Sequence, residues 1–279
     1  AANIGGMATL IGTPPNMIFA GFMSEQFNRQ IGFVEWLPVG LSASALLGSI
    51  AYLILRRGLG KTELSPSEEA RTRSWLEEEW ARLGDLSASQ RRVAIIFALT
   101  ALLWVLRPYL SSWLPAVQWS DTGIALAAAV LLFTVFDGSS KSILNWEDTK
   151  ALPWGILLLF GGGLALAGTL QASPWFELLG AQLESLQGIP FGAWLLVMAF
   201  LGVFATELLS NMALVSALLP LILSLATVLG LDFYSLSLPL VLGASCAFML
   251  PMATPPNAIV FSTGNLSMSY MMYRGIALN

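Results

Sequence analysis

Long apolar runs separated by short polar segments dominate the chain. The runs at 37–55, 93–110, 122–136 and 152–170 contain few or no charged residues. Each is long enough to approach or span the roughly 30 Å hydrocarbon layer of a bilayer as a helix. None shows the regular alternation of apolar and polar residues that the strands of a membrane barrel require. The pattern therefore predicts an all-α integral membrane protein with several spans.

Positive charge is concentrated in one polar segment. Residues 56–92 hold eight of the thirteen Lys and Arg residues, and this bias places the segment on the cytoplasmic side. Within it, 67–83 has helical spacing, with Trp75, Leu76, Trp80 and Leu83 on one side, which predicts an amphipathic helix at the membrane surface. The predicted order is a scaffold helix at 36–56, a cytoplasmic loop at 57–92 and two scaffold spans at 93–136.

Composition argues against an enzyme. Hydrophobic residues make up 56% of the chain and charged residues 11%, and there is no histidine. The chain thus lacks the usual proton shuttle and the commonest metal ligand, and it has no Ser–His pair, paired-aspartate motif or HExxH motif. The single cysteine, Cys246, excludes a disulfide within the chain. We expect no enzymatic activity and no nucleic-acid partner.

Two apolar runs are interrupted by the same polar motif. The sequence TPPN occurs at 13–16 and again at 254–257. Because proline has no N–H and clashes with the preceding turn, each pair predicts a broken helix, one at 1–30 and one at 236–273. Asn16 and Asn257 are expected to cap the restarting helices, whose N-termini would favour an anion while freed carbonyls favour a cation. A simple proline kink is the alternative for one such motif.

The spacing of the two motifs suggests repeats. Thr13 and Thr254 align at a separation of 241 residues, and the topology sends the first break outward and the second inward. Broken helices at corresponding positions of inverted halves point to a transporter binding site near the bilayer midplane.

A second polar interruption falls inside the apolar segment 188–230. TELLSNM, residues 206–212, lies near its midpoint. Two full spans joined by a loop would fit, but a re-entrant hairpin is favoured because it brings Arg274 to the cytoplasmic side. Glu207, beside the hairpin tip, is expected to be solvated, with a proton or cation relay as the alternative. The preceding segment, 151–186, is predicted to form a span followed by an interfacial arm helix at 173–186.

Four stretches resemble a known family in order and spacing: IGGMATLIGTPPN, LLLFGGGLALAGTL, TELLSNMALVSALLPLI and GASCAFMLPMATPPNAIVFSTG. They resemble the divalent anion/sodium symporter family of dicarboxylate and citrate carriers over nearly the whole chain. The resemblance implies a multi-span helical carrier with inverted-repeat elements, a re-entrant hairpin and two Pro-Pro-Asn broken helices. It also implies Na⁺ as the coupling ion, a small dicarboxylate anion such as succinate, malate or fumarate as substrate, and an elevator-like mechanism in a homodimer of the plasma (inner) membrane.

The resemblance also implies site residues. Ser210 and Asn211 at the hairpin tip, with Met212, would bind a substrate carboxylate that Thr254 and Pro255 border. Thr206, Leu209, Asn211 and Ala253 would supply oxygens to one sodium site. Gly12 would belong to another sodium site.

The chain departs from the family pattern at two points. Met212 stands where the family has Thr, so one hydroxyl expected at the substrate is missing. The chain also begins after the place of a first Ser-Asn-Thr hairpin and stops before a final scaffold helix, which predicts a fragment with one complete half-site. The alternatives are a sodium-independent anion exchanger, a sulfate- or arsenite-type carrier on the same scaffold, or a fragment that does not transport.

Overall fold

The structure is a computed structural model, and it describes residues 2–58, 65–136, 142–152, isolated positions between 154 and 169, 188–264 and 266–279. Over these residues the fold is helical, and one isolated bridge joins Phe136 to Ser142. The chain divides into two compact units, Ala1–Arg56 with Trp154–Asn279, and Arg57–Pro153. The expectation of an all-α fold is confirmed.

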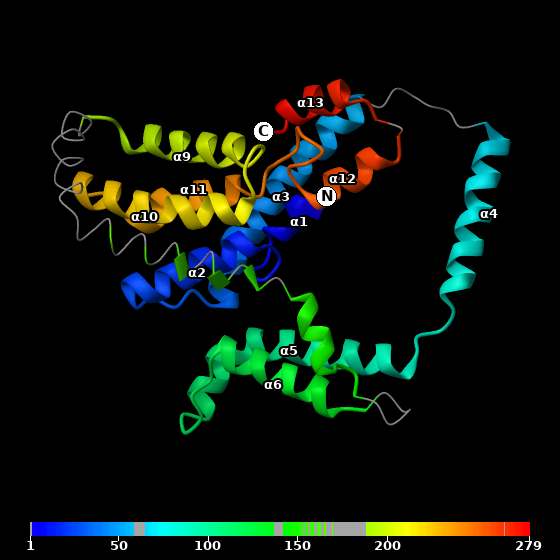
Figure 1. The fold of residues 1–279 in the computed structure, drawn as a ribbon, viewed down its shortest axis with the longest axis horizontal. Coiled ribbons are helices and arrows are strands. Elements are labelled where there is room, and N and C mark those ends of the chain that lie inside the picture. Colours follow the sequence, from blue (N-terminus) through cyan, green and yellow to red (C-terminus); the bar gives the residue numbers. More distant parts are fainter. Residues whose placement is uncertain are drawn as a thin grey trace. The chain divides into compact units, whose positions relative to one another are not determined.

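The first unit contains the two predicted breaks and the predicted hairpin. Its helices are α1 (Ala2–Gly6), α2 (Pro14–Phe27), α3 (Phe33–Gly58), α9 (Phe191–Ala205), α10 (Asn211–Leu229), α11 (Phe233–Gly243), α12 (Pro255–Ser262) and α13 (Met268–Ile276). Helices α2, α9, α10 and α11 run side by side, with α11 packed on the other three (Figure 1). Their shared interior is apolar, and Val215, Leu219, Leu236, Leu240 and Val241 are fully buried in it.

Glycines allow α9 and α11 to approach each other tightly. A Cβ atom on Gly202 would lie 2.6 Å from the Leu240 carbonyl oxygen, and one on Gly243 would lie 3.0 Å from that of Ala199. Small residues at such contacts are typical of helix packing in membranes, where close backbone approach replaces the hydrophobic effect as the source of stability. The hairpin arm α9 is therefore held against the helix that leads into the second break.

The segment 236–273, predicted as a single broken helix, contains three helices. Helix α11 ends at Gly243, α12 ends at Ser262 and α13 begins at Met268. Gly264 has φ 74° and ends the second piece, and the Ser267 side chain caps α13 by accepting from the Tyr270 N–H. A left-handed glycine followed by a capping serine makes a turn, so the chain after the second break changes direction before α13.

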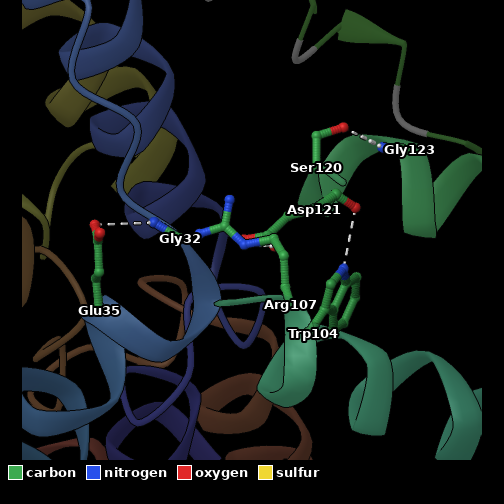
Figure 2. A network of polar contacts seen from close by, with 7 residues as sticks. All are labelled: Gly32, Glu35, Trp104, Arg107, Ser120, Asp121 and Gly123. Atoms are coloured by element: carbon green, nitrogen blue, oxygen red, sulfur yellow. Dashed lines mark hydrogen bonds and ion pairs between the residues drawn. The ribbon is translucent and has the colours of Figure 1, made fainter. Parts of the chain in front are cut away.

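The second unit contains α4 (Pro66–Leu83), α5 (Ala88–Trp113), α6 (Asp121–Thr134) and the 3₁₀ helix η1 (Trp146–Ala151). A capping box between Ser87 and Gln90 begins α5. Helices α5 and α6 are joined by a polar contact, because Arg107 Nε lies 3.0 Å from Asp121 Oδ1 and Trp104 Nε1 donates to the Asp121 carbonyl at 3.0 Å (Figure 2).

The segment predicted as an amphipathic helix, 67–83, lies in helix α4, where Trp75 and Trp80 are 57% and 80% exposed, and its place at the membrane surface stays a prediction. The predicted arm helix at 173–186 lies outside the described residues, as does most of the predicted span 152–170.

Helix length and composition agree with a membrane protein. Helices α3, α5 and α10 are long and apolar enough to cross a bilayer, and α6, α9 and α11 are shorter apolar helices. Most of the apolar side chains on α5 are exposed, Phe97 by 64%. Exposed apolar helix faces of this extent are expected where lipid is the solvent.

Candidate functional site

Both TPPN motifs are true breaks in which the backbone leaves the helix and restarts at proline. Helix α2 begins at Pro14 and α12 at Pro255, so each proline pair occupies the first two helical positions. Proline suits those positions because their N–H groups have no partner within the helix. The N-caps Thr13 (φ −147°, ψ 140°) and Thr254 (φ −145°, ψ 152°) have nearly the same extended backbone. A simple kink is excluded at both motifs.

The predicted capping role of Asn16 and Asn257 is wrong. Each follows the proline pair and is the third residue of its helix, while the preceding threonine is the N-cap. Their side chains turn back into the unwound segment instead. Asn16 Nδ2 donates to the Thr9 carbonyl at 2.9 Å, and Asn257 Nδ2 donates to the Leu250 carbonyl at 3.1 Å. Both bonds join residues that are seven apart in the sequence. The two breaks therefore contain equivalent hydrogen bonds, and each bond satisfies a carbonyl that unwinding has freed.

The hairpin tip and the two breaks line one open cavity of about 690 Å³. Three helices begin at its wall, α2, α10 and α12, with the N-caps Thr13, Ser210 and Thr254. None of these three N-caps uses its side chain for a capping hydrogen bond. Each helix end carries a positive partial charge. Because α2 and α12 begin with two prolines, free N–H groups come mainly from α10, around Asn211 and Met212.

The charge of the cavity wall is unusual for an anion site. Among the described residues that line it there is no Lys or Arg, and the one charged side chain is that of Glu207. An anion here would be held by helix termini, hydroxyls and amides alone. A bound cation would supply the charge that the side chains lack.

Thr206 forms a group of oxygens with its neighbours behind the tip. It is completely buried, and its Oγ1 lies 2.7 Å from Asn211 Oδ1 and 3.0 Å from the Ala244 carbonyl oxygen. A hydroxyl has one proton and can donate to one acceptor at a time. Three oxygens thus converge with a single proton between them, and unwound backbone carbonyls of this kind hold coupling cations in broken-helix transporters.

The structure brings the predicted site residues together. The cavity wall includes Gly12, Leu209, Ser210, Asn211, Met212, Ala253, Thr254 and Pro255. Thr206 lies behind that wall and reaches it through Asn211. Gly12 is tightly enclosed, since a Cβ atom there would lie 2.2 Å from the Gly6 carbonyl oxygen. Residues from positions 12 and 255, far apart in the sequence, therefore face one space.

The expectation that Glu207 is solvated is wrong. Glu207 is 5% exposed, and its carboxylate accepts hydrogen bonds from three successive backbone N–H groups, those of Phe248 (2.8 Å), Met249 (2.8 Å) and Leu250 (2.9 Å), and from Asn279 Nδ2 (2.8 Å). The reason is the second break, where unwinding leaves consecutive N–H groups without helical partners. A carboxylate from the hairpin tip satisfies them.

One site residue was missed by sequence reasoning. Asn3, in α1, donates from Nδ2 to Thr254 Oγ1 at 3.0 Å and to the Ala247 carbonyl at 3.1 Å. It also lines the cavity. The sequence signal for Asn3 was a polar amide side chain in an otherwise apolar stretch. Its role became visible only in the structure, where α1 lies beside the second break.

Comparison with known proteins gives consistent matches along the whole chain. The model of the sodium:sulfate symporter transmembrane region matches residues 1–279. The chain is 35% identical to the sodium-dependent dicarboxylate transporter SdcS of Staphylococcus saprophyticus and 36% identical to that of Staphylococcus aureus. Each alignment covers 100% of this chain and 54% of the relative. The chain therefore spans about half the length of these curated relatives, all of which are named as transporters.

Proposed function

Because the chain belongs to the sodium:sulfate symporter transmembrane family, we propose that it forms part of a sodium-coupled secondary transporter of small di- or tricarboxylates of the succinate, malate and fumarate type. Its SdcS relatives are named as sodium-dependent dicarboxylate transporters. The observation that carries the proposal is the cavity at which three helix N-termini meet without any cationic side chain among its described residues.

The substrate carboxylate is placed at the start of α10. Ser210 and Asn211 offer a hydroxyl, an amide and the free N–H groups of the first helical turn, which together suit a carboxylate. Thr254 and Pro255 border the same space from α12. The second carboxylate of a dicarboxylate lies toward the N-terminus of α2, where Thr13 lines the cavity.

Sodium is placed beside the hairpin tip. The oxygens of Thr206 and Asn211, with backbone carbonyls of Leu209 and Ala253, make up the first site, and Gly12 of the other break belongs to the second. Two negative charges in a cavity that holds no described Lys or Arg need cations nearby. Coupling follows, since sodium and the anion each raise the affinity of the other by the same factor.

Met212 sets the choice of anion. Its side chain lines the cavity at a position where the family pattern has a threonine hydroxyl. A thioether is a weak acceptor and offers no donor, so the cavity has one fewer hydrogen bond for the substrate. Sulfate, the anion that the family description names, is the alternative cargo.

The proposed transport cycle is an elevator-like one. The hairpin α9–α10 is re-entrant, with its tip at membrane depth beside the two breaks, and the protein works as a multi-pass homodimer in the plasma (inner) membrane. The unit that holds the cavity moves as a whole past the bilayer, in an elevator-like motion, and carries anion and sodium together. The shared packing of α2, α9, α10 and α11 supports a unit that moves as one body.

Uptake by the complete protein in proteoliposomes tests the proposal. Radiolabelled succinate should accumulate when sodium is higher outside and fail to accumulate when potassium replaces it. Asn211→Ala should abolish uptake. Parallel assays add unlabelled sulfate or citrate as competitors of succinate uptake and rank the anions by their inhibition. Uptake that proceeds equally in potassium would overturn sodium coupling, and normal uptake by the Asn211 variant would overturn the site.

A further inference from the structure

Asn3 joins the first half of the site to the second. It lies in α1, before the first break, and its side-chain nitrogen reaches Thr254 Oγ1 at 3.0 Å and the Ala247 carbonyl oxygen at 3.1 Å. An NH₂ group has two protons, so one amide makes both bonds at once. The contact spans 251 residues of sequence and directly links α1 to the N-cap of α12.

The orientation of this amide is fixed by its partners. Nitrogen and oxygen of an asparagine side chain are distinguished by the hydrogen-bond network around them. A backbone carbonyl only accepts, so the Asn3 atom beside the Ala247 carbonyl must be the nitrogen. The same nitrogen faces Thr254. The oxygen of the Thr254 hydroxyl is therefore an acceptor in this contact.

That assignment determines where the Thr254 proton points. Thr254 is 6% exposed, its side chain makes no capping bond to α12, and its hydroxyl donates to no acceptor among the described residues. With a lone pair of Oγ1 taken by Asn3, the O–H is left to point elsewhere, and the cavity is the space that Thr254 lines. The hydroxyl is thus presented as a donor to whatever occupies the cavity.

The first break has no described side chain that orients its threonine hydroxyl in this way. Thr13 corresponds to Thr254 at the 241-residue spacing, but no described side chain donates to its hydroxyl. The residue that corresponds to Asn3 at the same spacing is Ala244, which has no side-chain amide. The N-caps of the two breaks are alike in backbone, and the oriented hydroxyl is one difference between them.

We propose that Asn3 is a positioning residue for the substrate, which holds the Thr254 hydroxyl with its proton toward the cavity so that it donates to a carboxylate oxygen. The inference rests on the proposed function, since it assigns Thr254 to the substrate. It implies that Asn3 contributes to substrate affinity through Thr254, without touching sodium.

The test measures the KM for succinate uptake in proteoliposomes that contain the complete protein, and compares the wild type with single and double variants at Asn3 and Thr254. Asn3→Ala should raise KM about tenfold, as expected for a lost hydrogen bond to a charged group, with kcat changed much less. Thr254→Val should raise it similarly, and the double variant should be no worse than either single variant, because both remove the same donor. Asn3→Asp should be worse than Asn3→Ala, since its carboxylate accepts the hydroxyl proton and adds a negative charge beside the anion.

Controls separate this inference from a general loss of structure. Asn145→Ala removes an asparagine from the other compact unit, at the N-cap of η1, and should leave KM unchanged. The sodium concentration for half-maximal uptake should stay constant in Asn3→Ala. Additive losses in the double variant, or a wild-type KM in both Asn3 variants, would overturn the inference while wild-type uptake still supports the proposed function. Absence of sodium-driven uptake in the wild type would overturn the proposed function itself.

Discussion

Glu207 shows how a single charged residue is accommodated inside an apolar unit. Its carboxylate accepts from the backbone N–H groups of 248–250 and from the Asn279 side chain. A buried charge is tolerated when hydrogen bonds replace its hydration. The carboxylate belongs to the hairpin tip and the amides to the second break, so this contact holds together two sides of the candidate substrate site.

Replacing Glu207 with Gln should destabilise the protein. A glutamine amide directs an NH₂ group at backbone N–H groups that need an acceptor, and hydrogen bonds to charged groups contribute about 1.5–3 kcal/mol each. We expect a loss of at least about 2 kcal/mol, measured as a lower Tm in detergent. Glu25→Gln changes an exposed carboxylate on α2 and should leave Tm unchanged. Equal Tm values for the two variants would show that the Glu207 contacts contribute no stability.

Gly12 should be irreplaceable by alanine for a steric reason. A Cβ atom there would meet the Gly6 carbonyl oxygen at 2.2 Å, whereas one on Gly5 meets nothing within 4 Å. The backbone of the first break would have to move, at a cost of about 1–3 kcal/mol. Gly12→Ala should therefore lower both Tm and apparent sodium affinity in uptake assays, and Gly5→Ala should change neither. If the two variants behave alike, the first break is not as tightly closed as described.

At the scale of elements, the second helix after each break, α3 or α13, supports the unwound backbone in the same way. Gly40 of α3 lies against the carbonyls of Met7 and Ala8, and Gly275 of α13 lies against Phe248 and Met249. Each glycine is seven residues after the first residue of its helix. The two contacts are therefore equivalent, which gives structural support to the repeat that the TPPN motifs predicted.

Alanine at either glycine should weaken its own break. The added Cβ would lie 2.5 Å from the Ala8 carbonyl oxygen at position 40 and 2.5 Å from that of Phe248 at position 275. Both variants should lose comparable stability in a thermal-unfolding assay, about 1–3 kcal/mol. Gly48→Ala is the matched control on α3, because its Cβ would be 3.9 Å from Ile4 Cγ2. A wild-type Tm in both Gly40→Ala and Gly275→Ala would contradict the support role.

Sequence patterns predicted the elements well where the signal was local. The apolar run at 37–55 lies within α3, the spacing of Trp75 and Trp80 identified α4, and the proline pairs marked both breaks. Apolar length and missing N–H groups act on neighbouring residues, so no tertiary contact is needed to read them.

Prediction failed where the partner is distant in sequence. The bonds of Glu207 to 248–250 and of Asn3 to Thr254 depend on which elements pack together. The roles of Asn16 and Asn257 were misassigned for a different reason. Proline at the first two helical positions fixes the N-cap at the threonine, three residues before the asparagine, and the asparagine side chain then faces the preceding loop.

At the scale of the whole molecule, the unit that contains the cavity offers polar groups for both an anion and a cation within an apolar protein. In the proposed function, helix N-termini and the Thr254 hydroxyl would hold an anion, and the oxygens around Thr206 would hold a cation. Neither ion has a side-chain counter-charge among the described lining residues except Glu207, which is already satisfied by four donors. Under this proposal each ion would depend on the other for compensation of its charge.

The most direct test is the equilibrium affinity for succinate as a function of sodium, measured with the purified complete protein at constant ionic strength. The account predicts that the succinate Kd falls by about tenfold or more when sodium replaces potassium, as for a coupling of 1–3 kcal/mol, and that Asn211→Ala removes this dependence. The same Kd in sodium and in potassium would contradict it.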